Sequence, residues 1–223
     1  MIVGERKPLE EIKAMVEPYK RLLILGCGTC VSVCMAGGEK EVEVLASQLR
    51  MLNEKEGRRQ EIEEATIQRQ CDREYIEPCL EKIRKADAVL SMACGVGVQF
   101  VAEVAGENTI VLPALNTQFY GANLGAGIWA ERCAGCGKCI LHLTGGICPI
   151  ARCAKRLFNG PCGGSQRGKC EVNPETDCAW QLIYDRLKGL GKLAVLEEIV
   201  PAKSWKPSLS GGPRKVVRED LQL

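Results

Sequence analysis

Apolar and polar positions alternate in two different ways along the first half of the chain. Compact apolar runs at 22–25 and 88–92 are typical of buried strands, whereas the residues Val42, Leu45, Leu49 and Leu52 recur at helical spacing. The whole pattern predicts helices and strands in turn. Helices are expected over 8–20, 38–56, 72–85 and 99–105, and strands over 22–25, 61–67, 88–92 and 109–112.

Strands that alternate with helices favour a parallel sheet, because each connection must cross a face of the sheet before the next strand begins. We therefore expect an α/β fold in which residues 1–120 form a small Rossmann-like parallel-sheet domain.

The pattern changes near Tyr120, where Gly-rich turns and closely spaced cysteines replace regular periodicity. We expect residues 121–200 to form an irregular, ferredoxin-like segment organised around metal, with helices over 176–189 and 193–199. Residues 201–223 contain three prolines and two adjacent glycines, which predicts an extended arm, either disordered or laid across a partner.

Charge and composition exclude several classes of function. The net charge of +2 and the aromatic content of 4% indicate neither nucleic-acid nor membrane binding. Met1 leads into charged residues and no apolar run is long enough to span a bilayer, so we expect a cytoplasmic protein. With His142 as the single histidine, nothing supports nucleophilic catalysis through a histidine pair.

Fourteen cysteines change this picture, because they are clustered and have almost no imidazole beside them. A disulfide framework would require an oxidising compartment, so we expect these thiols to be reduced or bound to metal. Dense thiolate ligands are typical of soft metals and above all of iron–sulfur clusters.

The first group is Cys27-x-x-Cys30-x-x-x-Cys34, which follows the strand 22–25. The loop after the strand 88–92 carries Cys94 to the same sheet edge, where ligands of doubly wound folds bind. These four cysteines are predicted to hold a [4Fe–4S] cluster. A dinucleotide site is disfavoured, because Gly26-x-Gly28 lacks the third glycine of that fingerprint.

The second group contains eight cysteines with short spacings: Cys133, Cys136, Cys139, Cys148, Cys153, Cys162, Cys170 and Cys178. They would bind two [4Fe–4S] clusters, or one cluster and one tetrathiolate zinc, and spacing does not reveal how the ligands are divided. The chain is thus expected to carry two or three clusters, with zinc in place of one as an alternative. Cys79 falls on an apolar helix face and Cys71 ends a polar segment, so both stay outside these sets.

Several segments carry a more specific resemblance. Residues 25–38, 131–139, 145–153, 159–164 and 168–185 resemble the MetV-type small subunit of acetogen methylenetetrahydrofolate reductase. This resemblance implies an iron–sulfur, electron-transfer subunit of the Wood–Ljungdahl pathway. It also implies a MetF-type flavoprotein partner, which holds FMN and the folate site, and a low-potential donor such as ferredoxin.

Two other functions remain open. In the first, the chain is a zinc-stabilised interaction subunit without a redox role. In the second, it is a catalytic iron–sulfur enzyme: Cys94 is not a ligand, so the cluster has only three cysteine ligands and one of its irons stays open for substrate. Basic residues among the second group of cysteines are either a docking surface for an acidic ferredoxin or ordinary solvated surface. They are Lys138, Arg152, Lys155, Arg156, Arg167 and Lys169.

Overall fold

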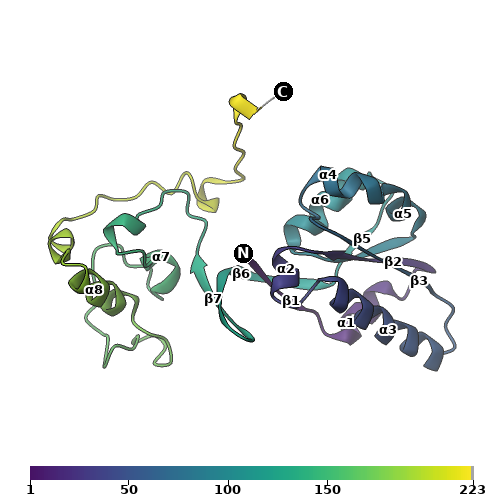
Figure 1. Ribbon diagram of the computed structural model, residues 1–223, viewed down its shortest axis with the longest axis horizontal. Coiled ribbons are helices and arrows are strands. Elements are labelled where there is room, and N and C mark those ends of the chain that lie inside the picture. Colours follow the sequence, from purple (N-terminus) through teal and green to yellow (C-terminus); the bar gives the residue numbers. More distant parts are fainter. Residues whose placement is uncertain (222–223) are drawn as a thin grey trace. The chain divides into compact units, whose positions relative to one another are not determined.

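The computed structural model describes residues 1–221 (Figure 1). Its contacts divide the chain into two compact units, of which the first is Met1–Ala130 and the second begins at Glu131.

The first unit is built on a parallel four-stranded sheet, as the alternation of strands and helices predicts. The strand order is β3 (Glu61–Ile67), β2 (Arg21–Cys27), β4 (Ala88–Met92) and β5 (Val111–Pro113). Strand β2 is hydrogen-bonded to β3 on one side and to β4 on the other. The chain therefore leaves β2 toward one neighbour and later returns to the other, which makes β2 the topological switch point of the sheet.

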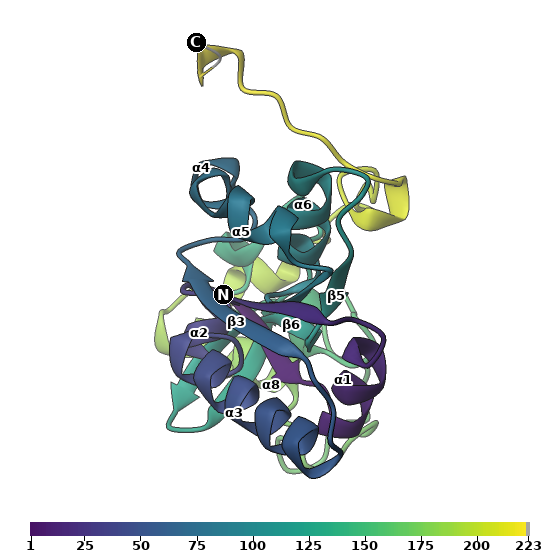
Figure 2. The same ribbon diagram turned by 90° about the vertical axis from the view of Figure 1, so that its right-hand side faces the viewer.

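Helices cover both faces of this sheet (Figure 2). Leu22 and Ile24 of β2 pack with helices α1 (Leu9–Val16) and α3 (Glu39–Lys55). Leu23 and Leu25 point to the opposite face, because successive side chains of a strand alternate. There they pack with α4 (Arg73–Ile76), α5 (Leu80–Lys85) and α6 (Gly95–Ala105).

Several helices differ from their predicted limits: the one expected over 8–20 ends at Val16, and the one expected over 193–199 is a 3-10 turn, Leu193–Glu197. The predicted helix 72–85 is broken by a 3-10 turn, Glu77–Cys79, which separates α4 from α5. The turn contains Pro78, which has no N–H for the helical hydrogen-bond ladder. Helix α6 begins at Gly95 rather than at 99, so its first turn lies directly after Cys94.

A second, three-stranded sheet replaces the Gly-rich turns expected beyond Tyr120. Its order is β1 (Ile2–Arg6), β6 (Leu115–Gly125) and β7 (Ile128–Cys133), with β1 antiparallel to β6. Most of β6 is exposed or half-exposed. A sheet of this kind needs no continuous apolar run, which is why the sequence pattern did not reveal it.

The second unit contains few regular elements. They are α7 (Pro149–Arg152), α8 (Ala179–Gly189) and the 3-10 turns Leu141–Leu143, Leu193–Glu197, Leu209–Gly211 and Glu219–Leu221. The buried side chains Trp180, Ile183 and Leu187 of α8 form its small core, and the Trp180 indole N–H donates to the Leu157 carbonyl at 3.2 Å. Tyr184 of the same helix is 43% exposed.

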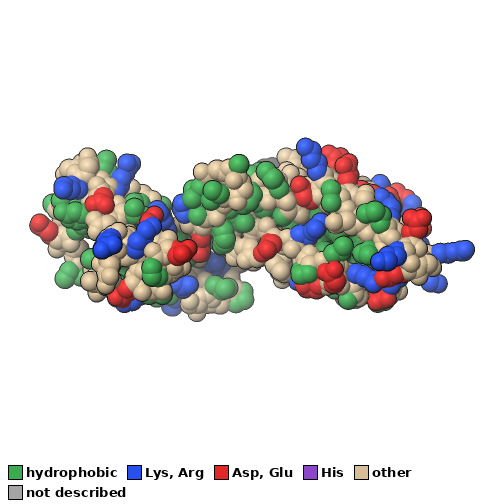
Figure 3. Space-filling view, turned by 90° about the horizontal axis from the view of Figure 1, so that it is seen from below, with side chains coloured by type: hydrophobic (Ala, Val, Ile, Leu, Met, Phe, Trp, Pro, Cys, Tyr) green, Lys and Arg blue, Asp and Glu red, His purple; other side chains and the backbone are tan. Residues whose placement is uncertain are grey.

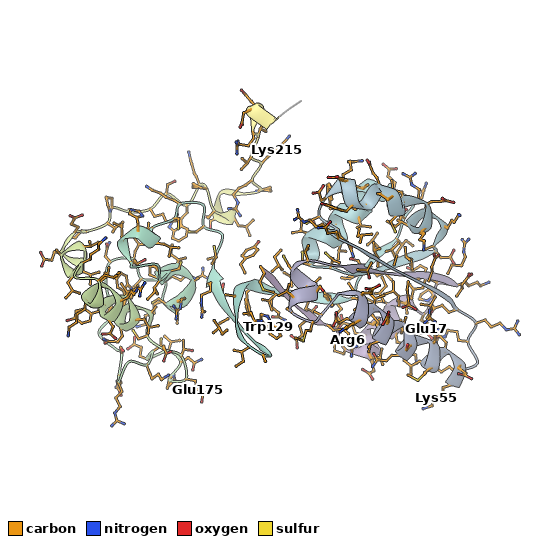
Figure 4. All side chains as sticks on the ribbon, in the orientation of Figure 1. Arg6, Glu17, Lys55, Trp129, Glu175 and Lys215 are labelled. Atoms are coloured by element: carbon orange, nitrogen blue, oxygen red, sulfur yellow. The ribbon has the colours of Figure 1, made fainter. Side chains whose placement is uncertain are left out.

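Charged side chains of both signs are interspersed over the face of the first unit seen in Figure 3. Many form ion pairs, such as Arg58 with Glu17, which lies at the end of α1 (Figure 4), at 2.5 Å. Within residues 1–221, no helix is both long enough and apolar enough to cross a membrane.

Candidate metal centres

Three adjacent strands of the parallel sheet lead into cysteines at their carboxyl ends. Cys27 is the last residue of β2, Cys94 precedes the first residue of α6 after β4, and Cys71 follows β3. Because β2 lies between β3 and β4, these cysteines belong to three neighbouring loops at one edge of the sheet.

Cys27 is fixed by backbone contacts on both sides. Its N–H donates to the Gly37 carbonyl at 2.9 Å, and the next N–H, of Gly28, donates to the Ile67 carbonyl at 2.9 Å. The Cys27 sulfur lies 3.9 Å from the Gln68 carbonyl oxygen, and the residue is 7% exposed. The turn after β2 is therefore held against the segment that follows β3.

The loop from Cys30 to Gly38 lies against the end of β4. Its first part is the short helix α2 (Cys30–Val33). At Gly37 a side chain is impossible without rearrangement, since a Cβ would lie 1.9 Å from the Met92 carbonyl oxygen. This close approach brings the loop of Cys30 beside the residues that lead from β4 into Cys94.

Cys94 is the N-cap of α6 and is 8% exposed. Its position is fixed by the neighbouring Gly95, whose N–H donates to the Thr117 hydroxyl of β6 at 2.8 Å. Cys27, Cys34 and Cys94 all belong to one buried cluster that also contains Val3 and Leu115.

The Cys34 thiol has partners of its own within that cluster. Its sulfur accepts the Gly4 N–H at 3.4 Å and lies 3.6 Å from the Gly4 carbonyl and 3.5 Å from the Val31 carbonyl. Cys34 also lines a hollow with Phe119 and with Trp129 of β7, which is labelled in Figure 4. Its sulfur is thus in contact with the backbone of β1.

Cys71, which the sequence pattern places outside the ligand sets, follows β3 at the same edge of the sheet. It is exposed, and partial desolvation followed by the neighbouring thiols of Cys27, Cys94 and Cys30 raises the pKa of its thiol. The sequence signal that would have identified it is its place after the predicted strand 61–67, which matches the places of the other groups after their strands. Cys79, in contrast, is buried in the core as predicted.

Gln70, the residue before Cys71, is hydrogen-bonded to two strands of the sheet. Its side chain is fully buried, and its amide N–H₂ donates to the Leu25 carbonyl of β2 at 2.7 Å. Its amide oxygen accepts from the Ser91 hydroxyl of β4 at 2.6 Å. One side chain therefore ties the loop after β3 to both neighbouring strands.

Four cysteines of the second unit surround one small cavity of about 20 Å³. They are Cys153, Cys162, Cys170 and Cys178. Backbone hydrogen bonds hold two of them in place, from the Cys170 N–H to the Thr176 carbonyl at 2.9 Å and from the Cys178 N–H to the Gly168 carbonyl at 2.8 Å.

Polar groups around this cavity suit thiolate rather than thiol. Backbone N–H groups of Val172 and Asn173 lower the pKa of the Cys170 thiol, with a smaller contribution from the Lys155 ammonium. The buried Ser165 hydroxyl also lines the cavity and has no hydrogen-bond partner within residues 1–221. A hydroxyl in this position is able to donate to a metal-bound sulfur.

The remaining predicted ligands of this unit are Cys133, Cys136, Cys139 and Cys148. The Cys133 sulfur accepts the Gly135 N–H at 3.4 Å, and the Cys148 sulfur accepts the Ala151 N–H at 3.5 Å. Such bonds stabilise thiolate and tune the metal that it binds.

The arm expected to be free or bound to a partner lies on this cysteine loop. The Lys203 ammonium donates to the carbonyls of Cys136 and Lys138, each at 3.1 Å. The Arg214 guanidinium donates to the Gly135 carbonyl at 2.8 Å. These cations thus bind backbone oxygens of the loop that carries Cys136.

In the part of the chain from 1 to 221, no three Cys, His, Asp or Glu side chains are already arranged to hold one metal ion. What the structure does place together are thiols of the donor type that iron–sulfur clusters and zinc prefer. Cys71 follows a strand at the same sheet edge as Cys27 and Cys94, and four other thiols surround the cavity of the second unit.

Residues 112–206 match the family model described as methylene-tetrahydrofolate reductase C terminal. The matched region contains all eight cysteines of the second group and none of the first. The resemblance to methylenetetrahydrofolate reductase is thereby confirmed for this part of the chain. No curated protein and no solved structure was found to match the chain.

Proposed function

We propose that this chain is an iron–sulfur electron-transfer subunit of a methylenetetrahydrofolate reductase complex, of the MetV type. The observation that carries the proposal is the gathering of thiols at the switch point of an α/β sheet, in a chain whose residues 112–206 match the reductase family. Ligands of doubly wound folds bind at this edge. Clusters bound by such thiols pass single electrons.

The proposal assigns the reduction itself to a separate MetF-type flavoprotein with FMN. Reducing the methylene group of the folate to a methyl group takes two electrons and two protons. A low-potential donor such as reduced ferredoxin loses those electrons one at a time, the present chain conducts them, and the flavin collects both. Solvent supplies the protons through the partner.

The eight cysteines of the second unit divide into two sets under this proposal. Cys153, Cys162, Cys170 and Cys178 share one cavity, and the other four form the second set. Four thiols around one small cavity are the donor set of a tetrathiolate zinc site. We assign zinc to this cavity and a [4Fe–4S] cluster to each of the other two sites.

The zinc site supports a second, structural function for part of the chain. The unit has a small apolar core around Trp180, so a tetrathiolate ion would contribute much of its folding energy. A chain that carried only zinc would be an interaction subunit without a redox role. The mixed set of metals combines that structural function with electron transfer.

Metal counting on protein purified without oxygen tests the proposal. We expect about eight irons, about eight sulfides and about one zinc per chain, together with an absorbance that bleaches on reduction. Reduced chain should then transfer its electrons to the FMN of the added flavoprotein partner. A colourless, zinc-only protein, or clusters that cannot reduce the flavin, would refute the electron-transfer function.

A further inference from the structure

One of the predicted ligands at the sheet edge, Cys34, packs in the same cluster as Cys27 and Cys94 but has its sulfur in contact with backbone groups. Cys27 and Cys30 lie at the end of β2 and just after it, Cys94 follows β4, and Cys71 comes directly after Gln70, whose side chain is hydrogen-bonded to both of these strands. Cys34, the fourth ligand expected from the sequence, has its sulfur against the backbone of β1. Cys71 is thus a candidate for the position that sequence spacing gives to Cys34.

We infer that Cys71 is a ligand of the sheet-edge metal site, together with Cys27, Cys30 and Cys94, and that Cys34 is a structural thiol. The inference rests on the proposed iron–sulfur site and specifies its ligands. Three neighbouring strands each supply at least one thiol, so the site spans the switch point instead of one side of it.

The position of Cys71 is fixed by its predecessor. Gln70 is completely buried and makes hydrogen bonds of 2.7 Å to Leu25 and 2.6 Å from Ser91. A ligand must be held close to its binding position by supporting residues, and Gln70 provides that support from the two strands that carry Cys27 and Cys94. Helix α6 also packs against it, since a Cβ at Gly97 would lie 2.9 Å from the Gln70 Cβ.

Cys34 lacks these properties of a ligand. Its sulfur already accepts one N–H and lies within 3.6 Å of two carbonyls, and the residue is 6% exposed. Turning it toward the other thiols would break these contacts and leave the Gly4 N–H without its acceptor. Cys71 is exposed and makes no comparable contacts among residues 1–221, so its thiol would lose fewer existing contacts on binding a metal.

An exposed ligand has a consequence for electron transfer. A cluster bound partly by Cys71 would reach the protein surface on that side, whereas the other three ligands belong to buried or half-buried residues. Electron transfer to a partner is fastest when the cluster lies near the contact surface, so the loop of Cys71 is where we expect electrons to enter or leave this site.

Differential alkylation tests the inference without any substitution. Metal-loaded chain is treated with iodoacetamide under anoxic conditions, before and after removal of iron by a chelator, and the labelled cysteines are identified by mass spectrometry. We expect Cys71 to be protected only while iron is bound. Cys34 should react slowly in both states, because it is buried. Rapid alkylation of Cys71 in iron-loaded protein would overturn the inference.

Three matched alanine variants provide the second test. Cys71→Ala should lose about four irons per chain and the paramagnetic signal of the reduced sheet-edge cluster. Cys34→Ala and Cys79→Ala should keep the iron and the signal while lowering the unfolding temperature. Full iron in Cys71→Ala with loss in Cys34→Ala would restore the ligand set expected from the sequence. A parent chain without iron would instead refute the proposed function itself.

Discussion

At the scale of single residues, Gln70 links the candidate metal site to the core of the sheet. Gln70→Leu keeps the size of the side chain but leaves the Leu25 carbonyl and the Ser91 hydroxyl buried without partners. We expect a loss of about 2–3 kcal/mol in the free energy of unfolding. Urea denaturation of the metal-loaded chain under anoxia measures it.

Gln68→Leu is the matched control for this change. Gln68 is exposed two residues earlier in the same segment, and we expect its substitution to alter stability by less than about 0.5 kcal/mol. Equal effects of the two substitutions would mean that the buried amide of Gln70 contributes nothing specific.

Asp87 couples the start of β4 to the start of β2 in a pH-dependent way. Its carboxylate accepts the Arg21 N–H at 2.8 Å and the Arg21 guanidinium at 2.7 Å, and these bonds hold its pKa below the usual 3.8. Because the folded pKa is depressed, the ionised group stabilises the fold above about pH 4, and that stabilisation is lost as pH falls through the folded pKa. Asp87→Asn should therefore lower the urea midpoint at neutral pH.

The same variant should differ less from the parent as the pH is lowered, since the parent's carboxylate is then protonated as well. Urea midpoints of both proteins at pH 7 and at successively lower pH measure this convergence. A constant difference at every pH would show that the charge of Asp87 is unimportant and that only its shape matters.

At the scale of elements, the first turn of α6 is where helix packing and the candidate site meet. A Cβ at Gly97 would lie 2.7 Å from the Ala93 Cβ and 2.9 Å from the Gln70 Cβ. Gly97→Ala should therefore cost about 1–3 kcal/mol, despite the better helix propensity of alanine. At Gly95, in the same turn, the nearest atom is 3.6 Å away, so Gly95→Ala should be neutral.

Thermal unfolding of the two variants, followed by circular dichroism, compares them directly. Iron content is the second measurement, because an α6 displaced by the new methyl group would also displace Cys94. If both alanines were neutral, the helix would have room to shift without disturbing the sheet edge.

The accuracy of the sequence interpretation differed between elements for a physical reason. Strands 61–67 and 88–92 have the predicted limits, and the second is a short apolar run whose residues are all buried. Strands β1 and β6 were missed because they are largely exposed on one face. The predicted helix 72–85 is not continuous, because Pro78 interrupts its hydrogen-bond ladder.

The candidate sites also contain features that the sequence predicts and features that depend on the fold. Residue type alone identified the cysteines as candidate ligands, but spacing favoured Cys34, which is near Cys30 in sequence, over Cys71, which is distant in sequence. Only the pairing of β2 with β3 brings Cys71 to Cys27. Likewise, the division of the eight later cysteines depends on which of them line a common cavity, and no sequence spacing encodes that.

At the scale of the whole molecule, the net charge of +2 does not indicate a partner, whereas the positions of unpaired basic residues do. Lys155 forms an ion pair with Glu171, and Lys169 pairs with Asp177 at 2.6 Å. Three other basic residues of the second unit, Lys138, Arg156 and Arg167, form no ion pair within residues 1–221.

Reversing these three charges to glutamate should slow electron transfer from an acidic reduced ferredoxin about tenfold at low salt, with less effect at high salt. Stopped-flow absorbance measures the rate. The control reverses Lys40, Lys55 and Arg59, which are exposed residues of the first unit and give the same change of net charge. Equal slowing in both triple variants would attribute the effect to net charge alone.

The arm is hydrogen-bonded to the loop of Cys133, Cys136 and Cys139 through Lys203 and Arg214. Gly137 of that loop has a positive φ of 79°, and a Cβ there would lie 2.3 Å from the Pro207 carbonyl oxygen. Gly137→Ala should therefore displace the arm and break the contacts of Lys203. We expect limited trypsin digestion to cut after Lys203 at least several-fold faster than in the parent.

Gly163→Ala separates arm displacement from backbone strain. Gly163 has a similar positive φ of 81° but nothing within 4 Å of its would-be Cβ, so this substitution strains the backbone without touching the arm. Faster cleavage in Gly137→Ala alone, accompanied by faster loss of iron in air, would mean that the arm shields the metal bound by this loop. If the arm served only to hold the flavoprotein, Gly137→Ala would still be cleaved faster and would weaken the complex, but it would lose iron no faster than the parent.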